Sequence, residues 1–144
     1  MDYINQKNNE ISNCFNVGKI SKVNDTFQRH GGIVGQITAG ANININNCYN
    51  IAVFSQGHGT NNVGGIVGEI SNTATVTMNK CYYLKQDDIK TAVYGKEDDT
   101  NQVVACNAIS EISATILNDN INNIEHEDEW KKWKIGEEGY PIFE

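Results

Sequence analysis

The side chains in this sequence that could do acid–base or metal chemistry include three histidines, His30, His58 and His126. They stand far apart, and no His-Glu-x-x-His, Gly-x-Ser-x-Gly or phosphate-loop motif accompanies them. A catalytic or metal-binding histidine needs other reactive groups to converge on it, and this spacing supplies none. We therefore expect loop histidines and a protein that is not an enzyme, with no catalytic, cofactor-binding or metal-ligating residue.

Two acidic runs are the remaining candidates for a cofactor site. They are Glu97-Asp98-Asp99 and the run from Glu125 to Glu129. Calcium prefers several oxygen ligands, which carboxylates can supply. Neither run has the spacing of a helix–loop–helix calcium site or of a calcium-binding β-roll. Solvated loops are the expectation, and calcium is the one cofactor that the sequence leaves open.

Three of the four cysteines recur at one position of a repeat, each followed by an aromatic residue. These pairs are Cys14-Phe15, Cys48-Tyr49 and Cys81-Tyr82. Stacked parallel strands would bring the cysteines to about 4.8 Å from one another, and three stacked thiols cannot all pair. We expect a ladder of buried, reduced thiols that act as small hydrophobes, with the aromatics as an internal or rim row. No Cys-x-x-Cys pair suggests zinc.

The glycines show the same period. Gly31-Gly32-Ile33-Val34-Gly35 returns 33 residues later as Gly64-Gly65-Ile66-Val67-Gly68. This is no dinucleotide fingerprint, because Gly-x-Gly-x-x-Gly is absent and an apolar strand follows where a helix would be required. The structural positions of the repeat are Gly31, Gly32, Gly35, Gly64, Gly65 and Gly68. Gly32, Gly35, Gly65 and Gly68 are expected to permit a tight corner and close approach between repeats.

The apolar pattern predicts three short strands in each repeat, over 31–38, 42–49 and 51–54. Apolar residues alternate with polar ones in the middle strand, which is the period of a half-buried strand. The alternatives are a β-sandwich or a propeller blade, but equivalent glycines and cysteines favour stacking of like on like. We predict a mainly β fold, a β-solenoid resembling a parallel β-helix, with about two and a half coils.

The predicted domain organisation is a repeat region, 1–84, and a C-terminal capping region, 85–144. The first copy of the repeat is incomplete, with Tyr3, Ile11 and Phe15 as inward candidates. A short helix is predicted near 110–118, capped by Ser110. Its expected apolar face comprises Ile109, Ile112, Ile116 and Leu117. An aromatic hairpin is predicted near 130–143. Helix and hairpin together are expected to cover the open end of the solenoid.

Composition excludes several function classes. The 144 residues carry a net charge of −7, which argues against nucleic-acid binding and against attraction to an anionic membrane. No apolar run is long enough to cross a bilayer, so no membrane insertion is expected. Residues 1–20 lack the layout of a signal peptide. Taken alone that indicates a cytosolic protein, but the incomplete first repeat favours a fragment whose signal lies upstream.

The repeats resemble the GLUG motif, loosely Gly-Gly-Leu-Val-Gly followed by Asn-Cys-Tyr. The matching words are Gly31–Gly35 with Asn47-Cys48-Tyr49, and Gly64–Gly68 with Lys80-Cys81-Tyr82. Ile33 and Ile66 replace the leucine. The resemblance implies a secreted or cell-surface bacterial protein, since such repeats occur in adhesin-like proteins and in some immunoglobulin A peptidases, outside the catalytic domain. It implies no catalytic residue.

These patterns together predict a non-catalytic stalk, spacer or adhesive segment attached to neighbouring domains of a larger chain. One alternative is a carbohydrate- or protein-binding module that uses a flat face to engage a host glycan or surface protein. A weaker alternative is a fragment of a polysaccharide-degrading β-helix enzyme, which would need convergent carboxylates. Because the first coil exposes unpaired strand edges, weak end-to-end self-association is also expected.

Overall fold

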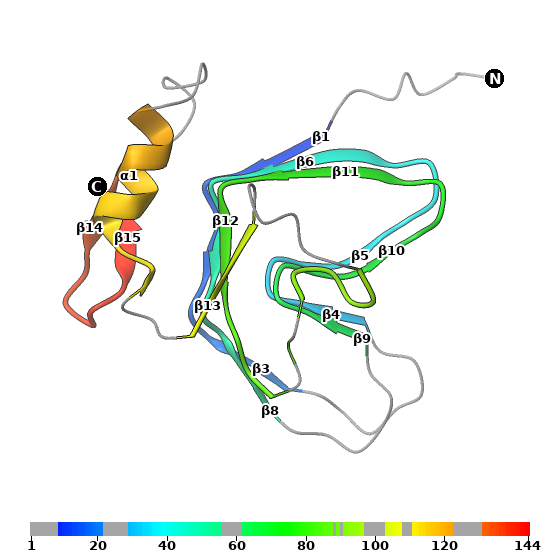
Figure 1. Ribbon diagram of the computed structural model, residues 1–144, viewed down its shortest axis with the longest axis horizontal. Coiled ribbons are helices and arrows are strands. Elements are labelled where there is room, and N and C mark those ends of the chain that lie inside the picture. The colour runs from blue at the N-terminus through cyan, green and yellow to red at the C-terminus, as the bar shows by residue number, and fades with distance from the viewer. Residues whose placement is uncertain are drawn as a thin grey trace.

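A computed structural model of the chain describes residues 9–21, 29–55, 62–87, 89, 91–96, 103–107, 111–122 and 131–144. Within these ranges the fold is mainly β, with short strands and one helix (Figure 1). The first repeat contributes β1 (Asn9–Ser12), β2 (Phe15–Asn16) and β3 (Lys19–Ser21). The second contributes β4 (Arg29–Gly31), β5 (Val34–Ile37), β6 (Asn42–Asn46), β7 (Tyr49–Asn50) and β8 (Val53–Ser55). The third contributes β9 (Asn62–Gly64), β10 (Val67–Ile70), β11 (Thr75–Asn79) and β12 (Cys81–Leu84). The remaining elements are β13 (Val103–Cys106), α1 (Ala114–Asn122), β14 (Trp133–Ile135) and β15 (Pro141–Phe143).

The described part of the second repeat holds five strands, so the prediction of three was wrong. The segment expected as one strand over 42–49 breaks at Asn47, whose φ is 50°. A left-handed residue ends a strand because it turns the backbone, and asparagine adopts this conformation more easily than most residues. The segment expected from 31 begins as a strand only at Val34, because Gly31 ends β4.

Strands of successive repeats pair in parallel and in register. Residues of β6 lie opposite residues of β1 at a separation of 34, as in Ile45 with Ile11, and opposite those of β11 at 33, as in Ile45 with Met78. The parallel sheets are β1-β6-β11, β2-β7-β12-β13, β3-β8, β4-β9 and β5-β10. Each position of the repeat therefore lies beside its counterpart, as the spacing of the glycines and cysteines required.

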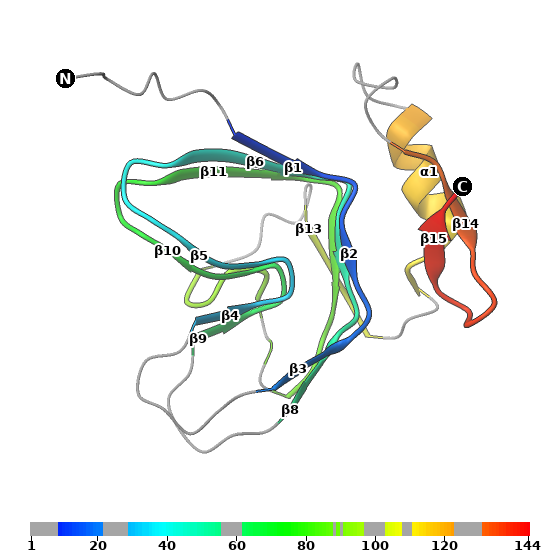
Figure 2. The same ribbon diagram turned by 180° about the vertical axis from the view of Figure 1, so that it is seen from behind.

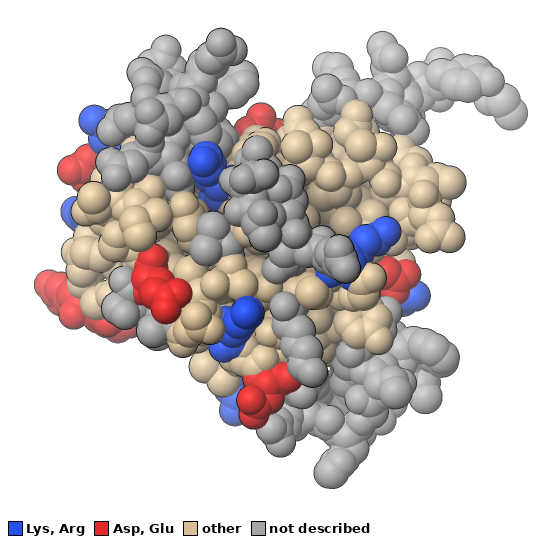
Figure 3. Space-filling model, viewed as in Figure 1, with Lys and Arg blue, Asp and Glu red and all other residues tan. Residues whose placement is uncertain are grey.

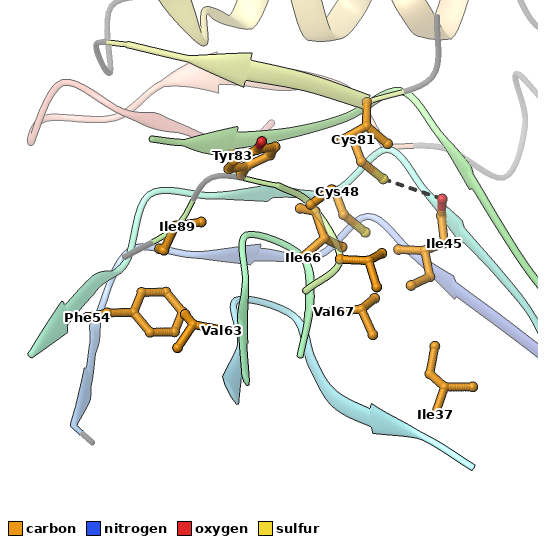
Figure 4. Close-up of a cluster of buried hydrophobic side chains, with 13 residues drawn as sticks. Ile37, Ile45, Cys48, Phe54, Val63, Ile66, Val67, Cys81, Tyr83 and Ile89 are labelled. Carbon is orange, nitrogen blue, oxygen red and sulfur yellow. Dashed lines mark hydrogen bonds between the residues drawn. The ribbon is translucent and has the colours of Figure 1, made fainter. Parts of the chain in front are cut away.

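The second and third repeats each fold around an inward pair of strands, which we call the tongue: β4 and β5 in the second repeat, β9 and β10 in the third. In Figure 1, β4 and β5 run into the space bounded by β6, β7 and β8, with β9 and β10 on them, and Figure 2 shows the same from behind. Apolar side chains fill this space, among them Ile66 and Val67, which are fully buried. Figure 4 shows these two side chains beside Ile45, with the thiols of Cys48 and Cys81 next to them.

The period breaks after Leu84, and described residues within 86–106 cover most of the third repeat. We call them the covering segment. Val93 forms a parallel bridge with Val67, and the amide of Ile66 donates to the Ala92 carbonyl oxygen over 2.9 Å. The side chain of Gln86 replaces a strand beside β8. Its amide nitrogen donates to Ala52 and its oxygen accepts from the Phe54 amide, at 2.8 and 3.1 Å.

The predicted C-terminal hairpin is present, since β14 and β15 pair antiparallel. The helix begins later than predicted. The Ser113 hydroxyl accepts a hydrogen bond of 3.2 Å from the Ile116 amide and so caps α1, whereas Ser110, like Ile109 and Tyr3, lies outside the described residues. Ile112 and Leu117 are buried as expected, but Ile116 is 39% exposed, so its assignment to the apolar face was wrong.

Helix and hairpin pack against the outer face of the β2-β7-β12 sheet and do not cover the end of the stack (Figures 1 and 2). This corrects the expected role of the helix and hairpin as an end cap. The reason is that adjacent residues on these strands, such as Cys81 and Tyr82 of β12, are both apolar and point to opposite faces. A strand that is apolar on both faces must be covered on both. The C-terminal elements supply the outer cover, and the covering segment supplies the end.

Candidate functional site

The two glycine corners, Gly31–Gly35 and Gly64–Gly68, are the tightest part of the repeat. A β-carbon on Gly31 would lie 2.6 Å from the Gly68 amide nitrogen and 2.7 Å from the Ile66 carbonyl oxygen. A β-carbon on Gly64 would lie 2.7 Å from the carbonyl oxygen of Ala92. The positive-φ glycines among the described residues lie elsewhere, at Gly40, Gly95 and Gly139. The corner glycines are therefore required for space rather than for backbone conformation.

The second glycine of each corner faces a side chain from the neighbouring sheet. A β-carbon on Gly32 would overlap the side-chain amide of Asn50, and one on Gly65 would overlap the ring of Tyr83. Asn50 is fully buried, and its Nδ2 donates to the Gly65 carbonyl oxygen over 2.8 Å. In the same way, Nδ2 of Asn16, in the first repeat, donates to the Gly32 carbonyl oxygen of the second repeat over 2.8 Å. These asparagines tie the tongue to the outer sheet.

Sequence reasoning missed this role for Asn16 and Asn50, although both stand two residues after the repeated cysteine.

The space around the third glycine of each corner differs between the two repeats. Gly68 is tight, since a β-carbon there would lie 2.7 Å from the backbone nitrogen of His30. Gly35 has more room, because its nearest neighbour would be the Arg29 carbonyl oxygen at 3.2 Å. Its expected close approach therefore holds only in the later repeat.

The cysteines of the repeat form a column of free thiols along the stack. Cys48 Sγ donates to Asn46 O over 3.1 Å, and Cys81 Sγ donates to Ile45 O over 3.4 Å, as drawn in Figure 4. Burial and the neighbouring Cys48 raise the pKa of Cys14, and the hydrogen bond with Cys81 together with burial raises that of Cys48. Protonated, buried thiols are poor nucleophiles and poor metal ligands.

The corner before each cysteine carries a left-handed residue, at Asn13, Asn47 and Lys80, with φ between 50° and 56°. Asn47 Nδ2 donates to Asn13 Oδ1 over 2.9 Å, and Asn47 Oδ1 accepts from the indole nitrogen of Trp133 at 3.1 Å. Lysine cannot extend this amide pair, so the pairing ends at the second repeat. The corner thereby becomes the attachment point of the C-terminal hairpin.

The aromatic row lies under the C-terminal elements, where Tyr49 and Tyr82 are buried and Phe15 is half-buried. Phe15 and Tyr49 stack with centroids 5.4 Å apart and planes 11° apart, and Trp133 lies 5.3 Å from Tyr49. The Tyr49 hydroxyl donates to the Pro141 carbonyl oxygen, and burial raises its pKa. Tyr82 belongs to the same cluster and is 6% exposed. The row therefore serves internal packing and is closed to a sugar ring.

A flat polar face covers the outside of the β1-β6-β11 sheet. Asn42 lies opposite Thr75, and Asn44 lies opposite both Glu10 and Thr77. The alternate residues on these strands pack into the core. Polar side chains also pair between the strands at the end of β6, where Asn79 Nδ2 donates to Asn46 Oδ1 over 2.8 Å. This face offers hydroxyl and amide groups in regular rows.

Charged groups do not converge on one point in the described chain, where no cluster of metal-ligating side chains is found. Arg29 pairs with Glu69 across β4 and β10, and His30 lies half-buried on β4. The two acidic runs considered for calcium, together with His58 and His126, lie outside the described residues. An open hollow of about 570 Å³ beside the hairpin includes Glu138, which accepts a bond of 2.8 Å from the Tyr140 hydroxyl.

Comparison of the chain with protein-family models, with curated proteins and with solved structures finds no match. Among the described residues, no helix has the length and apolar character needed to cross a membrane. The architecture and the repeat positions themselves are therefore the basis for a functional proposal.

Proposed function

We propose that this chain is a short β-solenoid of GLUG-like repeats and that it serves as a non-catalytic stalk, spacer or adhesive segment of a secreted or surface-attached bacterial protein. The observation that supports the proposal most is the register. Ile45 pairs with Ile11 on one side and with Met78 on the other, so equivalent residues stack along one axis. Stacking of like on like is how solenoids are built.

The stacking supports a mechanical role. Backbone hydrogen bonds run along the stack from repeat to repeat, and the glycine corners pack so closely that one added methyl group would collide with the next repeat. Such a body resists bending because neighbouring repeats cannot shear without breaking both sets of contacts. A rigid module of this kind holds a neighbouring domain at a fixed distance from its anchor.

The thiol column fits a location outside the cell. Exposed thiols would be oxidised there, but the repeated cysteines are free, hydrogen-bonded and largely buried. Thiols with raised pKa values react slowly with oxidants and disulfides. The cysteines can therefore serve as small core residues in an oxidising environment. The location itself is proposed from the resemblance of the repeats.

The test combines two measurements on the purified chain. Assays on neutral and acidic polysaccharides should show no turnover, which separates this proposal from an enzyme fragment. Binding of the labelled chain to a glycan array and to immobilised host matrix proteins, with and without calcium, then separates the two non-catalytic roles. A reproducible ligand identifies an adhesive segment, and a blank on both surfaces leaves the spacer. Turnover of any polysaccharide would contradict the proposal.

The flat polar face supports a second candidate, a carbohydrate-binding module. Its hydroxyl and amide rows repeat at the spacing of parallel strands, about 4.8 Å, which suits an extended polymer with many hydroxyl groups. If the array gives a hit, the double variant Asn44→Ala with Thr77→Ala should abolish it. Gln36→Ala, exposed on β5, is the control and should bind as the parent does. Unchanged binding by the double variant would exclude this face.

A further inference from the structure

We propose that the open end of the stack binds a glycine-cornered segment of a partner protein, which docks there as an additional tongue. The open end is the side of the stack on which β1, β2, β3, β4 and β5 have no strand neighbour in the described part of the chain (Figure 2). Among the described residues, the first repeat contributes β1, β2 and β3 but no tongue. This inference goes beyond the proposed function and does not depend on it.

Apolar side chains at the open end are less buried than their counterparts in the next layer. They are half-buried and pack against the main core: Ile11, Cys14, Ile20, Ile33 and Val34. The counterparts, which have neighbours on both sides along the stack, are all buried: Ile45, Cys48, Phe54, Ile66 and Val67. Apolar side chains that share one exposed end are typical of an interaction site. A further tongue would add the missing neighbour.

The hydrogen bonds of the glycine corners run in one direction along the stack. The amides of Ile33 and Val34 both donate to the Ile66 carbonyl oxygen over 3.0 Å. The amides of Ile66 and Val67 in turn donate to the Ala92 carbonyl oxygen over 2.9 Å. By the same geometry, the Ile33 carbonyl oxygen faces the open end as the acceptor for a preceding corner. A partner segment with two free corner amides would complete the series.

The third glycine of the corner points to the same occupant. A β-carbon on Gly68 would lie 2.4 Å from the Gly35 carbonyl oxygen, because the second tongue packs against the third. Gly35 itself is exposed, and a β-carbon there would have its nearest neighbour at 3.2 Å. Gly35 is also not among the positive-φ glycines. The described chain thus gives Gly35 little steric reason to be glycine, whereas a docked tongue would supply one.

The docked segment must resemble a tongue in sequence. Its first glycine would lie against the Ile33 carbonyl oxygen and the Gly35 nitrogen. Gly31 lies in this way against Ile66 and Gly68, where a β-carbon would come within 2.7 and 2.6 Å of the same backbone atoms. When a segment adds to a sheet edge, main-chain bonds supply affinity and side chains supply specificity. We therefore expect Gly-Gly, two apolar residues and a further glycine.

The register argues against the residues that precede β1 as the occupant. Asn9 pairs with Ile43, and the second tongue begins at Arg29, 14 residues before Ile43. The eight residues before Asn9 are too few to include a counterpart of the corner.

A second copy does not fit either. Its corner amides are engaged, those of Ile33 by Ile66 and those of Ile66 by Ala92. Two open ends placed face to face would set one Ile33 carbonyl oxygen against another. The opposite end of the stack carries the covering segment, and Figure 3 views that end, where charged side chains of both signs are spread over the surface. A partner of another sequence is the remaining source.

The test measures binding of a labelled ten-residue peptide, a copy of Arg29–Thr38, to the full chain by fluorescence anisotropy. The peptide should bind saturably at one site. Gly35→Ala in the chain should weaken binding by about tenfold or more, because the added methyl group meets the docked corner, and should leave the thermal midpoint near that of the parent. Gly136→Ala is the matched control in the hairpin, where a β-carbon also has its nearest neighbour at 3.2 Å. It should bind the peptide as the parent does.

Two changes in the peptide test the mode of docking and leave the chain untouched. N-methylation of the nitrogens of its Ile33 and Val34 removes both corner donors and should abolish binding. Gly31→Ala in the peptide should also abolish binding, because it adds a methyl group at the closest contact. A scrambled peptide of the same composition should not bind.

Alkylation of Cys14 supplies an independent readout. Of the three repeat cysteines Cys14 alone is not buried, so iodoacetamide should modify it faster than Cys48, and bound peptide should slow the reaction. A peptide that does not bind, an N-methylated peptide that binds equally well, or parental binding by Gly35→Ala would each overturn the proposal. Cys14 as unreactive as Cys48 in the free chain would show that residues of the chain itself cover the open end. Protection of Cys14 that rises with chain concentration alone would show that a second copy does, and either result would also overturn it.

Discussion

The side-chain nitrogen of Asn50 lies 2.8 Å from the carbonyl oxygen of Gly65 and joins β7 of one repeat to the glycine corner of the next. The oxygen of the same amide accepts a bond of 3.0 Å from the Ala52 backbone nitrogen. One buried side chain thus satisfies a donor and an acceptor that no water can reach. The fold depends on such pairs because the tongue places backbone groups in the middle of an apolar core.

Replacing Asn50 by alanine should destabilise the fold by about 2 kcal/mol, since buried polar groups left without partners cost roughly 1–3 kcal/mol each. The measurement is urea unfolding, in which the midpoint should fall while the slope stays constant. Asn16→Ala removes the equivalent bond at a half-buried position and should cost less. Equal losses at the two positions would contradict the importance of burial.

Gly31→Ala should cost about 3 kcal/mol or prevent folding, because its methyl group would meet the backbone of the next repeat. Backbone atoms cannot move aside as a flexible side chain can. Gly18→Ala is the matched control, with only the Asn16 side chain at 3.4 Å, and thermal unfolding should show its midpoint near that of the parent. A well-folded Gly31→Ala variant of parental stability would mean that the corner is looser than described.

The glycines and cysteines show how far the sequence predicts this fold. Their shared period identifies which residues stack. The raised pKa of Cys48 keeps its thiol uncharged, and the thiol donates a hydrogen bond to Asn46, so a small, polarizable side chain suits this column. The number of strands was harder to predict, since the breaks at Asn13 and Asn47 depend on single left-handed residues within otherwise regular alternation. Local backbone conformation of this kind leaves little trace in apolar periodicity.

The position of the C-terminal elements could not be predicted for a different reason. The sequence indicates an apolar hairpin and helix but not which surface they cover. The clue lies in the Cys-aromatic pairs, since adjacent apolar residues on a strand require cover on both faces. Beside β8 the end of the stack is completed by a side chain, since Gln86 replaces a backbone strand there. Such a contact leaves no periodic pattern in the sequence.

Trp133→Phe should destabilise the chain by about 1–3 kcal/mol, because it leaves the buried Asn47 oxygen without its indole donor and shrinks a fully buried side chain. The expected readout is a lower thermal midpoint together with faster proteolysis near the hairpin. Tyr140→Phe removes a hydroxyl bonded to Glu138 at the surface and should leave both unchanged. Parental stability of Trp133→Phe would show that the hairpin is not anchored at this corner.

The buried thiols predict that stability declines in alkaline solution. Burial and the nearby Glu111 raise the pKa of Cys106 from 9.0 to about 11. The unfolded chain therefore loses this proton at a lower pH than the folded chain does. The contribution of the thiol is complete below pH 9 and is lost as the pH rises toward 11. Urea unfolding at pH 8, 9, 10 and 11 should show the decline, with a shallower one in Cys106→Ala. If the free energy of unfolding fell equally steeply with pH in the parent and in Cys106→Ala, the Cys106 thiol would be excluded as the cause.

The most direct test of parallel, in-register stacking is to lengthen the stack by one repeat. A second copy of the 33 residues Gly31–Val63, inserted between Val63 and Gly64, should add one coil that pairs with both neighbours. We expect a cooperatively folded protein of equal or higher thermal midpoint, longer along the stack by about 4.8 Å in small-angle scattering. A scrambled insert of the same composition should remain protease-sensitive. If the true repeat also unfolds the protein or stays sensitive to protease, the account of the fold as stacked equivalent coils is wrong.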